Sequence, residues 1–176
     1  MGNIWITSDT HYNHANILNF KDANGRPTRH FTSIDEMNET MIDRWNSVVK
    51  PGDKVYHLGD VVFGDDKEGW MKQHWNRLKG RKRLVVGNHD NVKMLARGSW
   101  FDKVDLWRMF PEFGLMLTHV PVHPSTLGES HRFGEVEMIN VHGHIHQNPS
   151  PDGPYRCVCV EQINYTPVNL EEIRIR

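Results

Sequence analysis

The feature that most constrains the fold is a pattern in which a short apolar run ends abruptly in polar residues. At the start of the chain, Ile4-Trp5-Ile6-Thr7 is followed by Asp9 and His11. Short runs of β-branched and bulky residues predict buried strands. The pattern returns at four further runs, which end at Asp60, Asn88-His89, His119 and His144-x-His146. Ligands in open α/β sheets bind beyond the carboxyl ends of strands, so the repetition predicts an α/β protein with a site at those ends.

Helical segments are expected between these strands. Ser33 and Glu36 have the spacing of a capping box, and apolar residues at helical spacing continue to about Val49. The helices expected besides this one cover 14–20, 67–79 and 91–97. The later strands are expected at 55–58, 84–86, 115–118, 136–141 and 156–160. The aromatic stretch 101–110 and the tail from Asn164 show no clear pattern.

Length and charge narrow the class of protein. A chain of 176 residues is the size of one domain, so we expect a single domain over 1–176. Lys and Arg total 21 against 22 Asp and Glu, which disfavours an extended nucleic-acid duplex as a partner. The basic cluster Lys79–Arg83 is expected at a turn, either as a solvated edge or as a site that steers phosphate. The pattern is equally compatible with a monomer and a dimer.

The cysteines and the apolar runs indicate where in the cell the protein is expected. Cys157 and Cys159 are the two cysteines, and two residues apart on one strand they are too distant for an easy disulfide. We expect them to be reduced and buried; half of a zinc site is the alternative, although no second pair completes it. Neither a membrane span nor a secretory signal is apparent. These features predict a cytoplasmic protein without a membrane partner.

The chain holds 12 histidines, and His is the commonest metal ligand in proteins. Seven donors lie at the strand ends: Asp9, His11, Asp60, Asn88, His119, His144 and His146. Mixed oxygen and nitrogen donors suit Mn²⁺, with Fe, Zn, Co or Ni as alternatives. Seven donors are too many for one ion and suit two divalent ions if a carboxylate bridges them. Two ions roughly 3.5–4 Å apart can hold a hydroxide for in-line attack on phosphorus.

The ordered motifs resemble those of calcineurin-like metallophosphoesterases in their small single-domain form. They are Asp9-x-His11, Gly59-Asp60, Gly87-Asn88-His89-Asp90, His119 and Gly143-His144-x-His146. The resemblance implies a four-layer α/β/β/α sandwich of two mixed sheets flanked by helices. It also implies a dinuclear centre with Asp60 as the bridge. One ion would be held by Asp9, His11 and His146, and the other by Asn88, His119 and His144.

The same resemblance makes His89 the residue that contacts the phosphate and protonates the leaving group. One departure concerns its surroundings, because the family often has Gly-Asp-x-x-Asp-Arg where this chain has Gly59-Asp60-Val61-Val62-Phe63-Gly64. The missing Asp would orient His89 and the missing Arg would grip phosphate. Asp65 or Asp66 is a substitute for the first, and Asp90 is expected to order its loop.

Three further histidines are considered beside these motifs. His14 follows His11 by three residues, which favours substrate contact and a capping role equally. His123 is a candidate for lining the substrate pocket. His142 is expected to be packed away from the site.

The leading interpretation is a metal-dependent phosphodiesterase for small phosphodiesters, such as nucleotide-derived or 2′,3′-cyclic esters. The absence of the phosphate-gripping Arg favours diesters over monoesters. A nuclease acting on single strands is the alternative enzyme, and it needs a basic, aromatic-lined path. A scaffold that has lost its metals is the alternative from another class, and it should lack competent donors at the ligand positions.

Overall fold

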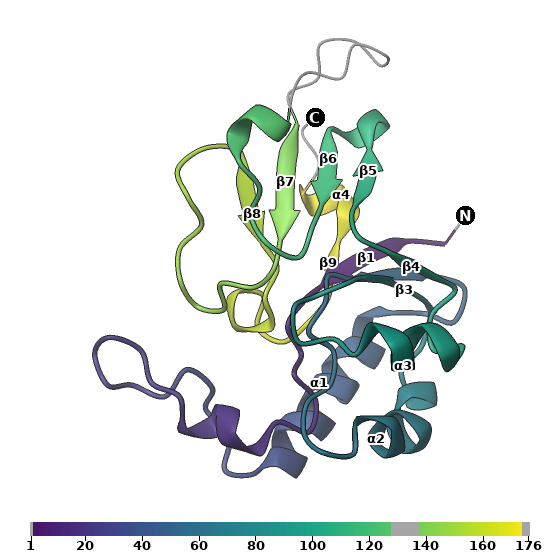
Figure 1. Cartoon of the computed structure of the whole chain (residues 1–176), viewed down its shortest axis with the longest axis vertical. Helices are drawn as coiled ribbons and strands as arrows, with labels where there is room; N and C mark the ends of the chain where they lie inside the picture. Colours follow the sequence, from purple (N-terminus) through teal and green to yellow (C-terminus); the bar gives the residue numbers. More distant parts are fainter. Residues whose placement is uncertain (1, 128–137, 174–176) are drawn as a thin grey trace.

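Two β-sheets face each other in the computed structural model, which describes residues 2–127 and 138–173 (Figure 1). The five-stranded sheet has the order β4-β3-β2-β1-β9 and the four-stranded sheet the order β5-β6-β7-β8. The strands of the first sheet are β1 (Ile4–Thr7), β2 (Lys54–His57), β3 (Arg81–Val85), β4 (Lys103–Asp105) and β9 (Val168–Asn169). Those of the second are β5 (Arg108–Phe110), β6 (Leu115–Leu117), β7 (Ile139–His142) and β8 (Tyr155–Cys157).

Both sheets are mixed, and each has a parallel centre. In the first, β1 to β4 run parallel and β9 joins β1 antiparallel. In the second, β6, β7 and β8 run parallel and β5 joins β6 antiparallel. Thr7 pairs with His57 and His57 with Leu84, so the carboxyl ends of β1, β2 and β3 lie level. The loops that carry the polar residues therefore leave the sheet from one edge.

The helices occupy the segments between the strands. They are η1 (Ala15–Asn19), α1 (Ile34–Val48), α2 (Lys67–His74), η2 (Trp75–Arg77), α3 (Val92–Arg97), η3 (Pro111–Phe113), η4 (Pro124–Thr126), η5 (Val160–Gln162) and α4 (Leu170–Ile173), where η marks a 3-10 helix. Ser33 caps α1 by accepting a hydrogen bond from the Glu36 amide at 3.1 Å. The Glu36 carboxylate accepts from the Thr32 amide and hydroxyl instead of the Ser33 amide, so half of the expected capping box forms.

Alternation along the strands divides the core into layers. Val55 and Leu84 point to the side of α1 and α2, where they pack with residues such as Trp45 and Trp75. Their neighbours Tyr56 and Val85 point to the opposite side and pack against the four-stranded sheet. In that sheet, Leu115 and Leu117 face the first sheet while Met116 joins a small outer cluster. This arrangement confirms two mixed sheets flanked by helices.

Several elements differ from the sequence-based expectation. The basic cluster begins at the expected turn, where Gly80 has positive φ, but its last three residues belong to β3, which begins at Arg81. Its cations are engaged within the protein: Arg81 pairs with Asp102 at 2.8 Å, and Arg83 donates to the Tyr56 hydroxyl at 2.7 Å. The stretch 101–110 forms β4 and β5, and the unassigned tail supplies β9 and α4. The expected strand 156–160 ends at Cys157, and η5 follows it.

Cys157 and Cys159 are both unpaired and buried, as expected from their spacing. The Cys159 thiol lies 3.3 Å from a carboxylate oxygen of Asp9. Neither thiol belongs to a group of potential metal ligands in the described part of the chain. Over the same part, no helix is long and apolar enough to cross a membrane.

Candidate metal centre

The predicted ligands lie on the loops that follow five strands from both sheets. Asp9 and His11 follow β1, Asp60 follows β2 and Asn88 follows β3. From the second sheet, His119 follows β6, and His144 and His146 follow β7. The two sets meet because the His144 amide donates to Asp9 at 2.9 Å, at the ends of β7 and β1 (Figure 1). Each sheet thus supplies one side of a single site.

Asp9 divides its two oxygens between the fold and the site. Its Oδ2 accepts from the Ser8 hydroxyl at 2.5 Å and from the His144 amide at 2.9 Å. Its Oδ1 is buried without a hydrogen-bond partner. That atom lies 3.8 Å from Nε2 of His11 and 3.9 Å from Nε2 of His146. Hydrogen bonds therefore fix Oδ2, whereas Oδ1 has a position from which it could bind a metal ion.

Asp60 lies between two groups of donors. Its Oδ2 is 3.5 Å from Nε2 of His11 and 3.5 Å from Nε2 of His119. Its Oδ1 accepts from the His89 amide at 2.9 Å, which fixes the carboxylate plane. A carboxylate oxygen equidistant from two imidazole nitrogens has the position expected of a bridging ligand.

The second group of donors converges on Asn88. Its Oδ1 lies 2.8 Å from Nε2 of His119 and 3.0 Å from Nδ1 of His144. His119 Nδ1 donates to the Leu58 carbonyl at 2.7 Å, which leaves Nε2 as the atom with a lone pair. An amide oxygen and an imidazole lone pair therefore point at each other, an arrangement that a cation satisfies.

The donor atoms fit divalent ions in spacing as well as in type. Ligand atoms bonded at about 2.0–2.2 Å to one ion lie roughly 3–4 Å apart, as these do. Asp9, His11 and His146 form one compact group, and Asp9, Asp60 and His119 form another. Both ring nitrogens of His11 are buried without a hydrogen-bond partner. Because buried polar atoms are normally satisfied, these orphaned donors support a bound cation.

Backbone geometry singles out the same residues. Nine non-glycine residues in the described ranges have positive φ, and five belong to this site. They are Asp9 at 57°, His11 at 46°, Asp60 at 56°, His144 at 72° and His146 at 51°. Left-handed backbone is disfavoured for residues with a Cβ, and such strain gathers at functional sites. The loops are held in this form by contacts that leave no room for side chains at Gly59 and Gly143, which lie against Gly87 and Ser8-Asp9.

Burial sets the charge state of the ligands in the absence of a cation. It raises the pKa of Asp9, although His119, His146 and hydrogen bonds to the carboxylate act in the opposite direction. It also lowers the pKa of His11 far below the ordinary value, with Arg29 contributing. His11 is therefore neutral at physiological pH and can present the lone pair of one ring nitrogen to a metal.

Two residues that the sequence analysis did not identify support the site from behind. Arg29 is buried, and its guanidinium donates to the carbonyls of Asp9 at 2.6 Å and Thr10 at 2.8 Å. It also pairs with Glu161 at 2.8 Å, and Glu161 accepts from Nδ1 of His146 at 2.9 Å. The carboxylate of Glu161 thereby orients the other nitrogen of His146 toward Asp9.

In the contacts from Arg29 through Glu161 to His146, each charged group stabilises the charged form of its neighbour. Burial alone would raise the pKa of Glu161, but Arg29 and His146 hold it below the ordinary value. Burial alone would lower the pKa of His146, but the hydrogen bond and charge of Glu161 raise it. Neither Arg29 nor Glu161 lies in a recurrent motif, so no local sequence signal identifies them.

His89 lies at the mouth of the site. Its ring centroid is 5.8 Å from that of His11 and 5.4 Å from that of Phe63, which it meets edge-on. No described side chain hydrogen-bonds its imidazole. Asp66 caps α2 by accepting from the Gly69 amide, so it does not replace the missing orienting carboxylate. Phe63, at the position of that carboxylate, contacts the ring instead.

Asp90 orders the loop, as expected. Its carboxylate accepts from the amides of Gly87, Asp60 and Val61 at 2.8–3.0 Å. The loop after β3 is thereby tied to the loop after β2, and Asn88 and His89 are held beside Asp60.

The other histidines have separate positions. His14 stacks on Phe63 with centroids 3.9 Å apart and lies 5.6 Å from His11, beside the mouth. His123 caps η4 through Ser125 and does not line the large cavity next to His119. His142 is buried and contacts the Ser150 hydroxyl, so it is packed away as expected.

Comparisons with known proteins agree with this geometry. A family profile described as "Calcineurin-like phosphoesterase" matches residues 2–173. An uncharacterized protein of Methanocaldococcus jannaschii is 33% identical over 180 residues, covering 98% of this chain and 90% of its own length. The Gene 66 protein of Mycobacterium phage L5 is 28% identical, over 83% of this chain and 78% of its own.

A solved structure shows the same fold. The crystal structure of a protein of unknown function from Aquifex aeolicus superposes with a TM-score of 0.70, at 28% identity and over 98% of both chains. The family match covers nearly the whole described chain and includes every strand end that carries a candidate ligand. The chain belongs to the calcineurin-like phosphoesterase family.

Proposed function

We propose that this protein is a dinuclear metal-dependent phosphodiesterase for small phosphodiesters, with Mn²⁺ as the favoured metal. Family membership supports metal-dependent hydrolysis of phosphoric esters. The observation that carries the dinuclear centre is the position of Asp60 Oδ2, 3.5 Å from the donor nitrogens of both His11 and His119. One carboxylate oxygen so placed would serve two ions.

The ligands divide into two sets around Asp60. Asp9, His11 and His146 would hold one ion, and Asn88, His119 and His144 the other. Bound divalent ions acidify water and neutralise charge on a phosphoryl group. The chain's own contribution is rigidity: hydrogen bonds fix Oδ2 of Asp9, Oδ1 of Asp60 and Nδ1 of His119, so each keeps one atom directed at the centre.

His89 has the position of a general acid in this scheme. Its backbone is held by Asp60, while its ring is exposed beside the candidate ligands. The imidazolium would donate its proton to the departing ester oxygen, since this group lies at the side open to substrate. The ring meets Phe63 edge-on, with centroids 5.4 Å apart.

The surroundings of His89 favour phosphodiesters over phosphomonoesters as substrates. A monoester dianion gains most from a bidentate arginine, and this chain has Phe63-Gly64 where the family often has Asp-Arg. Lys67 is the cation beside this loop, and its ammonium donates to the His89 carbonyl at 2.8 Å. A singly charged diester needs less positive charge from the protein than a monoester dianion does.

The nuclease alternative has less support. It would use the basic residues of 79–83, but Arg81 and Arg83 are paired within the protein. The scaffold alternative requires lost ligands, whereas each ligand position carries a competent donor. The reduced, buried cysteines support our proposal of a cytoplasmic protein.

The test is hydrolysis of bis(p-nitrophenyl) phosphate and of p-nitrophenyl phosphate by metal-stripped protein reconstituted with Mn²⁺. We expect metal-dependent turnover that is faster for the diester, and loss of turnover in Asp60→Asn. Asp43→Asn, at an exposed carboxylate on α1, is the matched control and should keep full activity. Two bound ions without turnover of either ester would refute the phosphodiesterase, and faster monoester turnover would refute the substrate class.

A further inference from the structure

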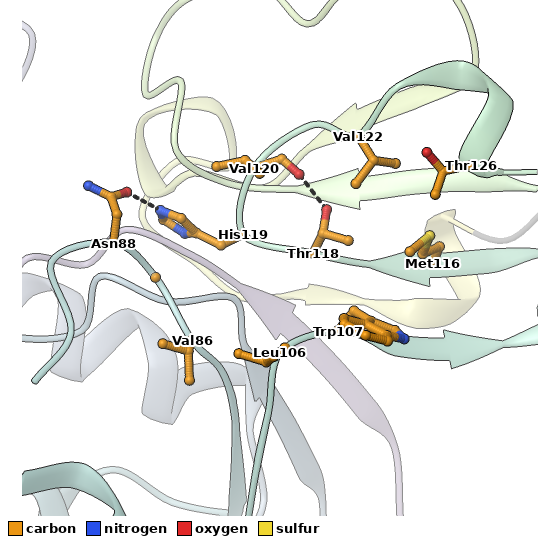
Figure 2. A pocket seen from close by; sticks show the side chains of 11 residues that line it. Val86, Asn88, Leu106, Trp107, Met116, Thr118, His119, Val120, Val122 and Thr126 are labelled. Atoms are coloured by element: carbon orange, nitrogen blue, oxygen red, sulfur yellow. Dashed lines mark hydrogen bonds between the residues drawn. The ribbon is translucent and has the colours of Figure 1, made fainter. Parts of the chain in front are cut away.

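A cavity of about 520 Å³ adjoins the candidate metal centre on the side of Asn88 and His119. Figure 2 shows these two residues at one end of the cavity and Met116 and Thr126 at the other. One cavity therefore begins at two candidate ligands and extends away from them. A ligand group attached to a phosphate at the centre would enter it directly.

The walls come from segments that follow strands of both sheets. On one side lie Val86 and the link between β4 and β5, which carries Leu106 and Trp107 (Figure 2). On the other side lie Val120 and Val122, from the loop after β6. The cavity therefore lies between loops of the two sheets, beside the link from β4 to β5.

Exposed apolar residues gather at this cavity. Leu106 is 70% exposed, Trp107 56% and Val120 44%. In the described ranges only Phe20 and Val92 are comparably exposed large apolar residues, so three of five line one cavity. Singly scattered apolar residues need no explanation, but a group beside a site indicates a binding surface.

The two threonine hydroxyls of the walls already donate hydrogen bonds within the protein. The Thr118 hydroxyl donates to the Val120 carbonyl at 2.6 Å, and the Thr126 hydroxyl donates to the His123 carbonyl at 2.6 Å. No Asp, Glu, Lys or Arg is among the lining residues in the part of the chain that the structure describes. Such walls exclude a charged group and select by shape and stacking.

We propose that this cavity binds an uncharged aromatic ring carried by the phosphodiester substrate, the class to which nucleobases belong. The proposal rests on the proposed phosphodiesterase function and names its substrate class. Trp107 provides the ring face on which an aromatic group stacks, and Leu106 and Val120 enclose its edges. The volume suits one such group, because ligand cavities of 300–1,000 Å³ hold drug-sized molecules.

Binding tests this inference separately from turnover. Dissociation constants of phenylphosphonate, hexylphosphonate and methylphosphonate are measured by calorimetry on the Mn²⁺-loaded protein. We expect phenylphosphonate to bind roughly five- to tenfold more tightly than methylphosphonate, the lower range for one aromatic stacking contact. Trp107→Ala should abolish that preference, whereas Trp107→Phe should keep most of it. Val92→Ala, an exposed apolar residue on α3 outside the cavity, is the control and should change nothing.

Kinetic measurements provide a second test of the same proposal. Bis(p-nitrophenyl) phosphate and methyl p-nitrophenyl phosphate share a leaving group and differ in the remaining ester group. The ratio of their kcat/KM values should fall roughly five- to tenfold in Trp107→Ala. Failure of the proposed function would appear as no turnover of either ester, with the binding preference intact.

Three results would contradict the proposal that the cavity binds an aromatic ring. Equal binding of phenyl- and methylphosphonate would show that the cavity receives no ester group. Tighter binding of hexylphosphonate than of phenylphosphonate would assign it to an alkyl chain. A change of oligomeric state in Trp107→Ala, measured by light scattering, with unaltered ligand preference would identify the surface as a contact between copies of this chain.

Discussion

The imidazole of His89 stands beside His11 without a hydrogen bond from any described side chain. A general acid matters most when the leaving group is a poor one. We expect His89→Ala to keep two bound ions and to lose about 10²–10⁴-fold in rate on a diester with an alkyl leaving group. The loss should be much smaller with p-nitrophenolate. Metal analysis and kcat on both substrates check this, and an unaltered rate on the alkyl ester would contradict the acid role.

His57 gives the fold a dependence on pH that can be measured without the metals. It is fully buried, and its pKa falls to about 3 because burial disfavours the imidazolium, with His119 adding to the effect. The unfolded chain therefore binds a proton at higher pH than the folded protein does. The stability contributed by neutral His57 is complete above about pH 6.5 and is lost as the pH falls toward the folded pKa.

A substitution isolates this contribution. The Thr10 hydroxyl donates to the Val61 carbonyl, so His57 Nε2 is the donor to Thr10 at 3.0 Å, and glutamine retains a donor there. Between about pH 7.5 and about pH 5, the metal-free wild type should lose about 2 kcal/mol more of its free energy of unfolding than His57→Gln. Urea unfolding at both pH values measures the difference. His30→Gln, at an exposed position, should behave as the wild type, and equal losses in all three proteins would count against a buried neutral His57.

At the scale of elements, the short helix η5 supports the loop after β7. Its Glu161 links Arg29 to His146, and a carboxylate behind a ligating histidine typically contributes 10–100-fold to metal affinity. We therefore expect Glu161→Gln to weaken metal binding by about that factor, measured by competition with a chromophoric chelator. Glu68→Gln removes an exposed ion pair with Lys72 and should leave affinity unchanged. Wild-type affinity in Glu161→Gln would show that the contact serves only the fold.

The elements also show which parts of the fold and the site can be predicted from the sequence. The loops after β1, β2, β3, β6 and β7 were predictable because each combines a strand pattern with donor residues in a short span. Arg29 and Glu161 were not, because they meet across 132 residues and neither belongs to a periodic pattern. Strand β9 has two residues, too few for alternation to appear. Arg81–Arg83 were misplaced because tertiary pairing overrides the polarity that suggests a turn.

At the scale of the whole molecule, the site joins the two sheets. Asp9, His11 and Asp60 lie at strand ends of one sheet, and His119 and His146 at strand ends of the other. Without a cation, Asp9 Oδ1 and the nitrogens of His11 are buried without partners, and each such atom costs the folded state its desolvation energy. Bound ions would therefore remove a local cost and connect the two sheets at once.

If ions connect the two sheets in this way, the free energy of unfolding should depend on metal concentration. A ligand that binds only the folded state adds about 2.7 kcal/mol at a concentration one hundred times its Kd, roughly 5–10 °C in Tm for a chain of this size. We expect Mn²⁺ to raise the Tm of metal-stripped protein progressively with concentration, and Asp60→Asn to lose most of the rise. Asp43→Asn should keep it. A constant Tm with ions demonstrably bound would mean that the unfolded chain binds them equally well, and the centre would then not hold the sheets together.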